Sequence, residues 1–106
     1  MILREKVQLG VDGYRDDDGK WIPPVLHDYL AEVAPISAEE QVARGRESSA
    51  VSYRVTLPRL RTGHEITATT TIVWRGITFD VVGAPTLFTV AGRLHHLEVV
   101  VSAASG

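Results

Sequence analysis

The sequence predicts a mainly β fold: a small antiparallel β-barrel or sandwich with one short α-helix and long loops. From Ser49 onward, apolar and polar residues alternate with a period of two, which is the spacing of strands that bury one face. The alternating runs are short and turn residues separate them, as is typical of small all-β barrels and sandwiches. At 106 residues the chain is expected to form one domain.

The first quarter of the chain is expected to be an N-terminal arm and loop over residues 1–24. A first strand over residues 2–9 is expected within it, followed by a polar loop over residues 12–20. Pro23-Pro24 prevents regular strand pairing at that point. Residues 25–34 then alternate and predict a strand. One face of this strand is expected to carry Val25, His27, Tyr29, Ala31 and Val33, and the other Leu26, Leu30 and Ala34.

A short helix is predicted near residues 37–45. Ser37 is a good N-cap, and Glu40 follows it at the spacing of a capping box. Gly45 ends the helix after about two turns, because glycine is the usual residue just past a helix C-terminus. With this helix included, the barrel is expected to span residues 25–102.

The second half of the chain is expected to supply most of the barrel. Residues 66–74 alternate, Arg75-Gly76 interrupts them, and alternation then resumes, which predicts a tight hairpin because Gly76 tolerates positive φ. The other expected elements are a strand at 53–57 ended by Pro58, a bend at 83–85, a strand at 87–90, a turn at 91–92 and a strand at 94–102. The expected inner-face residues are Tyr53, Val55, Leu57, Ile66, Ala68, Thr70, Ile72, Trp74, Ile77, Phe79, Val81, Leu97, Val99 and Val101.

Charge and composition exclude several classes of protein. The net charge is −2, and residues 1–50 carry −4 while residues 51–106 carry +2. This balance disfavours independent nucleic-acid binding, which needs a basic stripe. The chain has no cysteine and no apolar run of the ~18 residues that a membrane span needs, and its N-terminus lacks the apolar core of a signal peptide. We therefore expect no disulfide, no membrane association and no secretion signal.

Neither a catalytic nor a metal site is predicted. The run Asp16-Asp17-Asp18-Gly19 does not fit a calcium-binding loop, because Tyr14 and Val25 occupy the end positions that need ligands. His95 and His96 are adjacent in a predicted strand, so their side chains should point to opposite faces. We expect no enzymatic activity, no cofactor and no bound metal.

Two segments are candidates for binding. Arg59, Arg61 and His64 lie in one basic loop, which either contacts phosphate groups or forms a solvated tip. Trp21 is either a core residue or the apolar anchor of an interface. Trp74 is expected in the core.

Several segments resemble a known family when they are taken in order. They are an Asp/Gly-rich arm, then Ala34-Pro35-Ile36-Ser37-Ala38-Glu39-Glu40, Tyr53-Arg54-Val55-Thr56-Leu57-Pro58, Ile66-Thr67, the run from Val73 to Gly83, and a valine-rich last strand. Over residues 10–102 the chain resembles the head-closure, or stopper, proteins of tailed bacteriophages of actinobacteria. The resemblance implies a small β-barrel with a short helix and long loops.

The same resemblance implies a structural role in the neck of the virion, after synthesis in the host cytoplasm. Copies would form a dodecameric or hexameric ring below the portal and adaptor, and would contact the tail terminator or tail tube proteins. A loop reaching into the central channel would help to retain the packaged DNA without reading its sequence.

Carried onto this chain, the resemblance makes the 58–65 loop, with Arg59, Arg61 and His64, a candidate channel loop. The 12–20 segment becomes a candidate contact arm, with Asp16, Asp17, Asp18 and Trp21 as assembly contacts. Three alternatives stay open: a tail terminator, a cytoplasmic small β-barrel that binds a ligand or peptide, and a nucleic-acid-binding barrel of the OB type.

Overall fold

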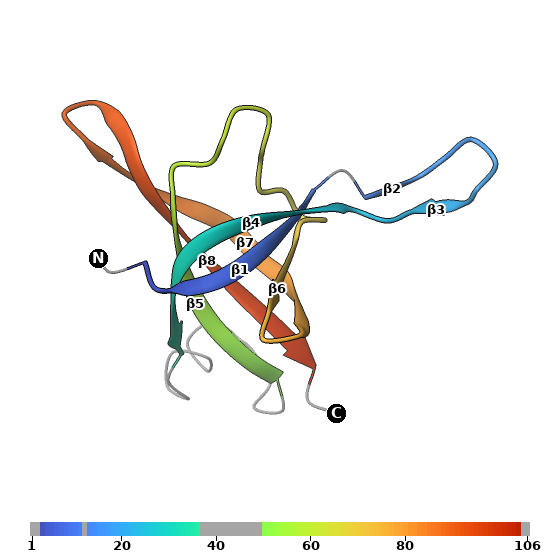
Figure 1. The fold of residues 1–106 in the computed structure, drawn as a ribbon, viewed down its shortest axis with the longest axis horizontal. Coiled ribbons are helices and arrows are strands. Elements are labelled where there is room, and N and C mark those ends of the chain that lie inside the picture. Colours follow the sequence, from blue (N-terminus) through green and yellow to red (C-terminus); the bar gives the residue numbers. More distant parts are fainter. Residues whose placement is uncertain (1–2, 12, 37–49, 105–106) are drawn as a thin grey trace.

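Six antiparallel strands close into a barrel in the computed structural model, which describes residues 3–11, 13–36 and 50–104 (Figure 1). The strands are β1 (Glu5–Val11), β4 (Val25–Pro35), β5 (Ala50–Pro58), β6 (Thr71–Trp74), β7 (Ile77–Val90) and β8 (Arg93–Ala104). Their order around the barrel is β1-β4-β5-β8-β7-β6. The predicted mainly β class is confirmed. Within the described ranges there is no helix, and the predicted helix near residues 37–45 lies outside them.

One set of alternating side chains from each strand fills the barrel. The largest fully buried side chains are those of Phe79, Leu9, Leu57, Ile72, Val7, Val55, Val99 and Val101. The predicted inner faces of β5 and β8 are therefore confirmed. Alternation was a reliable guide here because the two strands pair along their whole length, from Ala50↔Ala104 to Pro58↔His96.

The barrel begins at Glu5 rather than at residue 25. β1 pairs with β4 along its full length, and its second half also pairs with β6, which closes the barrel. At this closure Gly10 faces the side chain of Thr71, since a Cβ on Gly10 would lie 2.5 Å from Oγ1 of Thr71. A larger residue at position 10 would therefore require the Thr71 side chain to move.

The polar segment expected to be a loop over residues 12–20 contains a small hairpin. β2 (Tyr14–Arg15) pairs with β3 (Trp21–Ile22) as a separate two-stranded sheet that extends away from the barrel (Figure 1). We call this hairpin, residues 14–22, the arm. No strand lies over Pro23-Pro24, as predicted.

The predicted strand over residues 66–74 is wrong in its first half. β6 starts only at Thr71, because residues 67–70 form a turn in which Thr70 N donates to Thr67 O at 3.2 Å and Thr67 N donates to Thr70 Oγ1 at 2.8 Å. Threonine hydroxyls can bond the local backbone in this way and so compete with strand pairing. Residues 59–70, which we call the crossing loop, therefore run across one end of the barrel from β5 to β6 (Figure 1).

The predicted break at 83–85 is a bulge within one long strand. β7 continues through it, with a shift in its pairing to β8 between Val82 and Thr86, and Gly83 has a φ of 74°. A bulge bends a strand while the strands on both sides stay paired. The separate strand expected at 87–90 is thus the second half of β7.

Both predicted two-residue turns are confirmed. Arg75 and Gly76 have φ values of 52° and 76°, and Ala91 and Gly92 have 51° and 77°, which is the geometry of type I′ hairpins. Ile77 is in register with Trp74 and directly follows the turn, but its side chain is 52% exposed, so its predicted inner-face position is wrong. The described residues contain no helix that is long and apolar enough to cross a membrane.

Candidate functional site

Three segments extend from the same end of the barrel: the arm, the crossing loop and the far end of the β7–β8 hairpin (Figure 1). The C-terminus lies at the other end. The segments with candidate functional residues are therefore gathered on one side of the molecule.

Asp16 organises the tip of the arm. Its Oδ1 accepts hydrogen bonds from the backbone N–H groups of Asp18 at 3.0 Å and Lys20 at 2.9 Å, and Arg15 Nη1 donates to the carbonyl of Gly19 at 2.9 Å. The carboxylate of Asp16 is therefore used within the turn. Asp17 and Asp18 are exposed, so these two predicted contact residues present their carboxylates to a partner.

Trp21 is not a core residue. Its side chain is 51% exposed, and the buried part lies close to Gly13 and Pro24 at the base of the arm. A Cβ on Gly13 would come within 3.1 Å of both Trp21 Cη2 and Pro24 Cδ, so the indole needs a glycine there. This placement matches the second of the two predicted roles, an apolar group held in place and available to a partner.

Two of the three predicted channel residues hold the crossing loop against β4. Arg61 donates its backbone N–H to Tyr29 Oη at 3.0 Å and its Nη2 to the carbonyl of Asp28 at 2.9 Å, and its guanidinium lies 4.2 Å from the centre of the Tyr29 ring. His64 hydrogen-bonds through Nδ1 to the Tyr29 hydroxyl and packs against His27, with ring centres 4.1 Å apart. Arg59, the third predicted residue, is exposed.

The inner side of the crossing loop also closes the barrel. Leu60 and Ile66 pack against the core, so the loop covers the end of the barrel as well as connecting β5 to β6. The tip around Thr62-Gly63 is exposed. The loop is therefore held by apolar and polar contacts at several points along its length.

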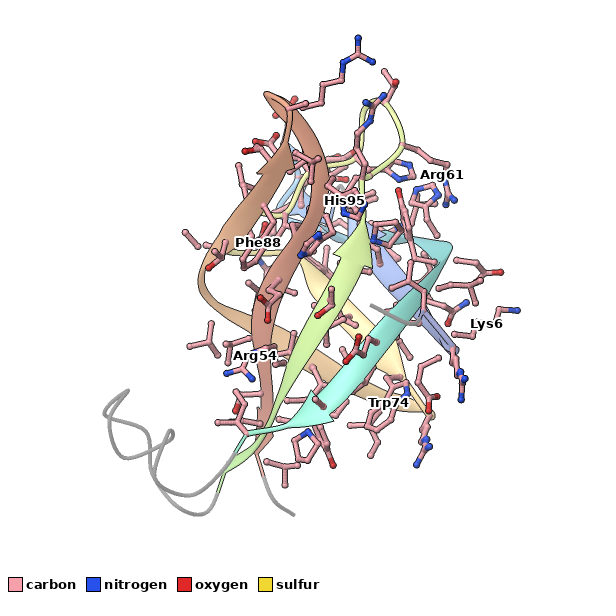
Figure 2. The ribbon with its side chains drawn as sticks, turned by 90° about the vertical axis from the view of Figure 1, so that its left-hand side faces the viewer. Lys6, Arg54, Arg61, Trp74, Phe88 and His95 are labelled. Carbon is pink, nitrogen blue, oxygen red and sulfur yellow. The ribbon has the colours of Figure 1, made fainter. Side chains whose placement is uncertain are left out.

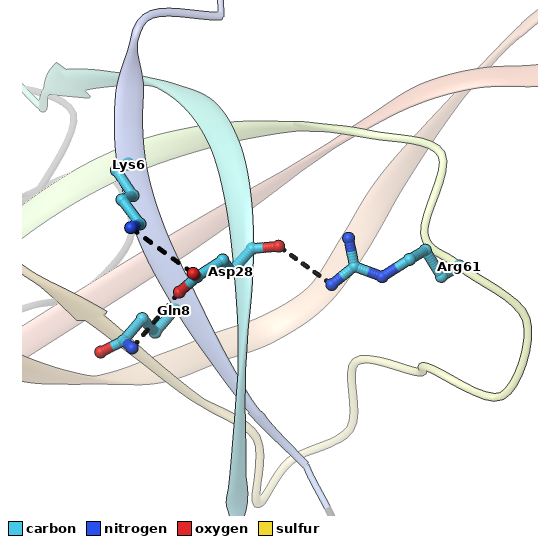
Figure 3. A network of polar contacts seen from close by, with 4 residues as sticks. All are labelled: Lys6, Gln8, Asp28 and Arg61. Atoms are coloured by element: carbon cyan, nitrogen blue, oxygen red, sulfur yellow. Dashed lines mark hydrogen bonds and ion pairs between the residues drawn. The ribbon is translucent and has the colours of Figure 1, made fainter.

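An open groove of about 620 Å³ lies where β1, β4 and the start of the crossing loop meet. We call it the basic groove. The residues that line it are Leu3, Lys6, Asp28, Tyr29, Leu30, Pro58, Arg59 and Arg61. The three cations are opposed by one carboxylate: Asp28 Oδ2 lies 3.5 Å from Lys6 Nζ, and Asp28 Oδ1 accepts from Gln8 Nε2 at 3.3 Å (Figure 3).

Sequence reasoning missed the basic groove. Lys6 and Arg59 are far apart in the chain, and the pairing of β1 with β4 and the return of the crossing loop onto β4 bring them together. Figure 2 shows Lys6 and Arg61 on the same side of the barrel, away from Arg54 and Phe88. An available signal was that Leu30 alternates with Tyr29 and so falls on the opposite face of its strand, where the structure leaves it 55% exposed.

The far end of the β7–β8 hairpin exposes apolar side chains. Leu87 and Val90 are each 60% exposed, and Phe88 stacks on His96 with ring centres 4.6 Å apart. β6 pairs with β7 only as far as Asp80, and among the described strands no other one pairs with that edge beyond it. Residues 81–90 carry no charge, so this edge lacks the charged residues that usually protect exposed strands.

The prediction that His95 and His96 point to opposite faces is wrong. Phe88 pairs with His96 and Thr89 with Leu94, which leaves His95 as the extra residue of a bulge. The bulge brings the two Nδ1 atoms within 2.9 Å of each other. In the part of the chain that the structure describes, no group of three or more His, Cys, Asp or Glu side chains could hold a metal ion.

Comparison with known proteins adds one fact about the fold. No model of a protein family matches the chain, and no curated protein matches it significantly. A solved structure that does match is the solution structure of protein SF1141 from Shigella flexneri 2a, with a TM-score of 0.64 and 23% identity. The match covers 98% of this chain and 93% of that one. At this identity the likeness establishes a shared fold and nothing about activity or partners.

Proposed function

We propose that this chain is a structural protein of the neck of a tailed bacteriophage, one copy in a ring that joins the DNA-filled head to the tail. The observation that carries the proposal is the place of the exposed apolar side chains. Trp21, Leu87 and Val90 lie on segments that extend from the barrel. Such side chains are typical anchors of contacts between proteins, whereas a catalytic site gathers its groups in a cleft.

The sequence resemblance supplies the identity of the assembly. A small barrel with long projections suits a ring subunit, because the barrel and its projections offer separate surfaces to neighbouring copies and to other rings. On this proposal the partners are further copies of the chain in a dodecameric or hexameric ring, the portal or adaptor above it, and the tail terminator or tail tube below it. A tail terminator with the same general architecture is the alternative within this class.

The proposed contact with packaged DNA depends mainly on Arg59. Arg61 and His64 are engaged with β4, so Arg59 is the predicted channel residue whose side chain is most available to a phosphate. A single arginine per copy still provides a ring of positive charge when many copies assemble. Contact of this kind is electrostatic and independent of sequence.

The size of the basic groove favours a second candidate, a module that binds a small ligand or peptide. Its volume of about 620 Å³ falls in the usual range for small-molecule sites, roughly 300–1,000 Å³. Such a module would act as a monomer and would need no contact through its projections. An OB-type nucleic-acid barrel is less well supported, because that fold has five strands and the barrel here has six.

The test is attachment to heads. Phage heads made without this protein are filled with DNA, mixed with the purified chain, and sedimented to measure how much chain they retain. We expect retention of the unaltered chain, a loss of more than tenfold for the double variant Leu87→Asp/Val90→Asp, and normal retention for Thr78→Asp at an exposed position near the other end of β7. A chain that binds neither heads nor tails, or a Leu87→Asp/Val90→Asp variant that is retained normally, would contradict the proposal.

A further inference from the structure

We propose that the arm of one copy docks in the basic groove of the next copy, so that the ring is built by repeated contacts between unlike surfaces. This inference rests on the proposed ring function and names the contact that would form it. It follows from the chemistry of the groove, the chemistry of the arm and the distance between them.

The basic groove is suited to a partner that is both apolar and acidic. Leu3, Leu30 and Pro58 line it with apolar surface, and Leu30 is 55% exposed in the isolated chain. Three cations and one carboxylate surround this surface, so the lining has an excess of two positive charges. An occupant should therefore bring an apolar side chain together with carboxylates.

The arm has this combination. Asp17 and Asp18 are exposed at its tip, and Trp21, which packs near its base, presents half of its surface. The arm also carries two cations: Arg15 is turned onto the carbonyl of Gly19, and Lys20 is exposed, so the arm as a whole has a net charge of −1. The acidic tip can thus meet Lys6 and Arg59 while Trp21 covers the apolar part of the groove. A guanidinium has five N–H donors, so Arg59 can bond a carboxylate of the arm and still present other donors to a phosphate of the packaged DNA. Charges at such a rim set the orientation and the rate of association, and the buried aromatic group supplies most of the affinity.

The arm cannot reach the groove of its own chain. The two lie at opposite ends of β1, with Lys6 near its start and the arm following its end (Figure 1). A seven-residue strand is about 23 Å long, whereas the four residues from Tyr14 to Asp17 span only about 13 Å. The contact must therefore form between two copies. A contact between unlike surfaces repeats from copy to copy, and it closes into a ring when the rotation between neighbours permits.

Engineered cysteines test the contact directly, since the chain has none of its own. A tagged Asp18→Cys variant is mixed with an Arg59→Cys variant under mild oxidation, with and without heads. In parallel, the tagged variant is mixed with Thr78→Cys, an exposed position on β7. We expect the 18–59 heterodimer to form at least tenfold faster than the 18–78 heterodimer, with a lower rate at high salt. Equal rates for the two pairs would overturn the inference.

Charge exchange provides a second test that uses no cysteine. The variant Asp17→Lys/Asp18→Lys has a basic arm and a basic groove, and Lys6→Glu/Arg59→Glu has an acidic arm and an acidic groove. Each variant should fail to form rings on heads when it is alone. An equal mixture should form them again, because each arm then meets a groove of opposite charge. Rings from either variant alone, or none from a mixture of two correctly folded variants, would contradict the contact.

The two proposals fail in different ways. If the chain binds heads but the 18–59 pair shows no preference, the proposed function stands and the arm has another partner. If the 18–59 pair is favoured but the chain binds neither heads nor tails, the contact between copies stands and the neck assignment fails. Head binding and cross-linking rates therefore separate them.

Discussion

The arm and the crossing loop are both polar segments without large buried side chains, yet they have opposite relations to the barrel. The crossing loop is held at several points: Leu60 and Ile66 reach the core, and Arg61 and His64 bond to Tyr29. The arm is organised by bonds within itself, mainly those to Asp16. The comparison indicates that polar composition does not decide whether a loop packs on the barrel. A few side chains that contact the core or hydrogen-bond to a strand decide it.

The difference also separates the candidate roles of the two segments, a channel loop for the crossing loop and an assembly contact for the arm. A segment that is held on the barrel keeps one shape, and this suits a fixed element that closes the barrel and presents Arg59. A segment that is organised independently can meet a partner without disturbing the core. Substitutions that remove the contacts holding each segment test this contrast.

The largest effect is expected from Tyr29→Ala. Tyr29 is buried, and its ring supports Arg61 and His64, so its removal leaves a cavity under the crossing loop. We expect the free energy of unfolding to fall by about 3–5 kcal/mol. Chemical denaturation measures this change, and Tyr14→Ala, an exposed tyrosine in the arm, is the matched control with an expected change within about 0.5 kcal/mol. Similar losses in the free energy of unfolding for the two variants would contradict the difference between the crossing loop and the arm.

A smaller effect is expected from Thr70→Val, which keeps the shape of the buried side chain and removes its hydroxyl. The N–H of Thr67 then loses its partner at 2.8 Å, and the turn that precedes β6 is weakened. We expect a loss of about 1–3 kcal/mol in the free energy of unfolding. Thr62→Val at the exposed tip of the crossing loop should leave it unchanged. If the two variants unfold alike, the Thr67–Thr70 turn does not hold the loop.

Tyr29→Phe separates the contribution of the Tyr29 hydroxyl from that of its ring. It removes the acceptor of the Arg61 N–H and the partner of His64, while the ring stays in place. We expect a loss of about 1 kcal/mol. Amide hydrogen exchange should accelerate at Arg61 and His64 and remain unchanged in the arm. Unchanged exchange in the crossing loop would show that apolar contacts alone hold it.

The smallest global effect is expected from Asp16→Ala. The backbone N–H groups of Asp18 and Lys20 lose their acceptor, so their exchange should accelerate. The free energy of unfolding should change by less than about 0.5 kcal/mol, because the arm shares no strand pairing with the barrel. Asp17→Ala should alter neither quantity. A large global loss from Asp16→Ala would mean that the arm and the barrel fold as one unit.

The sequence predicted the barrel well where strands pair along their length. The inner faces of β5 and β8 and both type I′ turns follow from alternation and from glycine placement. The prediction failed where local hydrogen bonding or register changed the pattern. The hydroxyl of Thr70 delays the start of β6, and the bulge at His95 turns two adjacent histidines toward each other.

Sequence by itself determined the class of the fold and the acidic character of the arm, because alternation and charge are local properties that a single segment carries. The tertiary structure alone decided which polar residues are engaged and which are available. Asp16 and Arg61 are engaged in hydrogen bonds within the chain, while Asp17 and Arg59 are exposed. It also created the basic groove, because the barrel pairing of β1 with β4 brings Lys6 beside a loop more than fifty residues away in the chain.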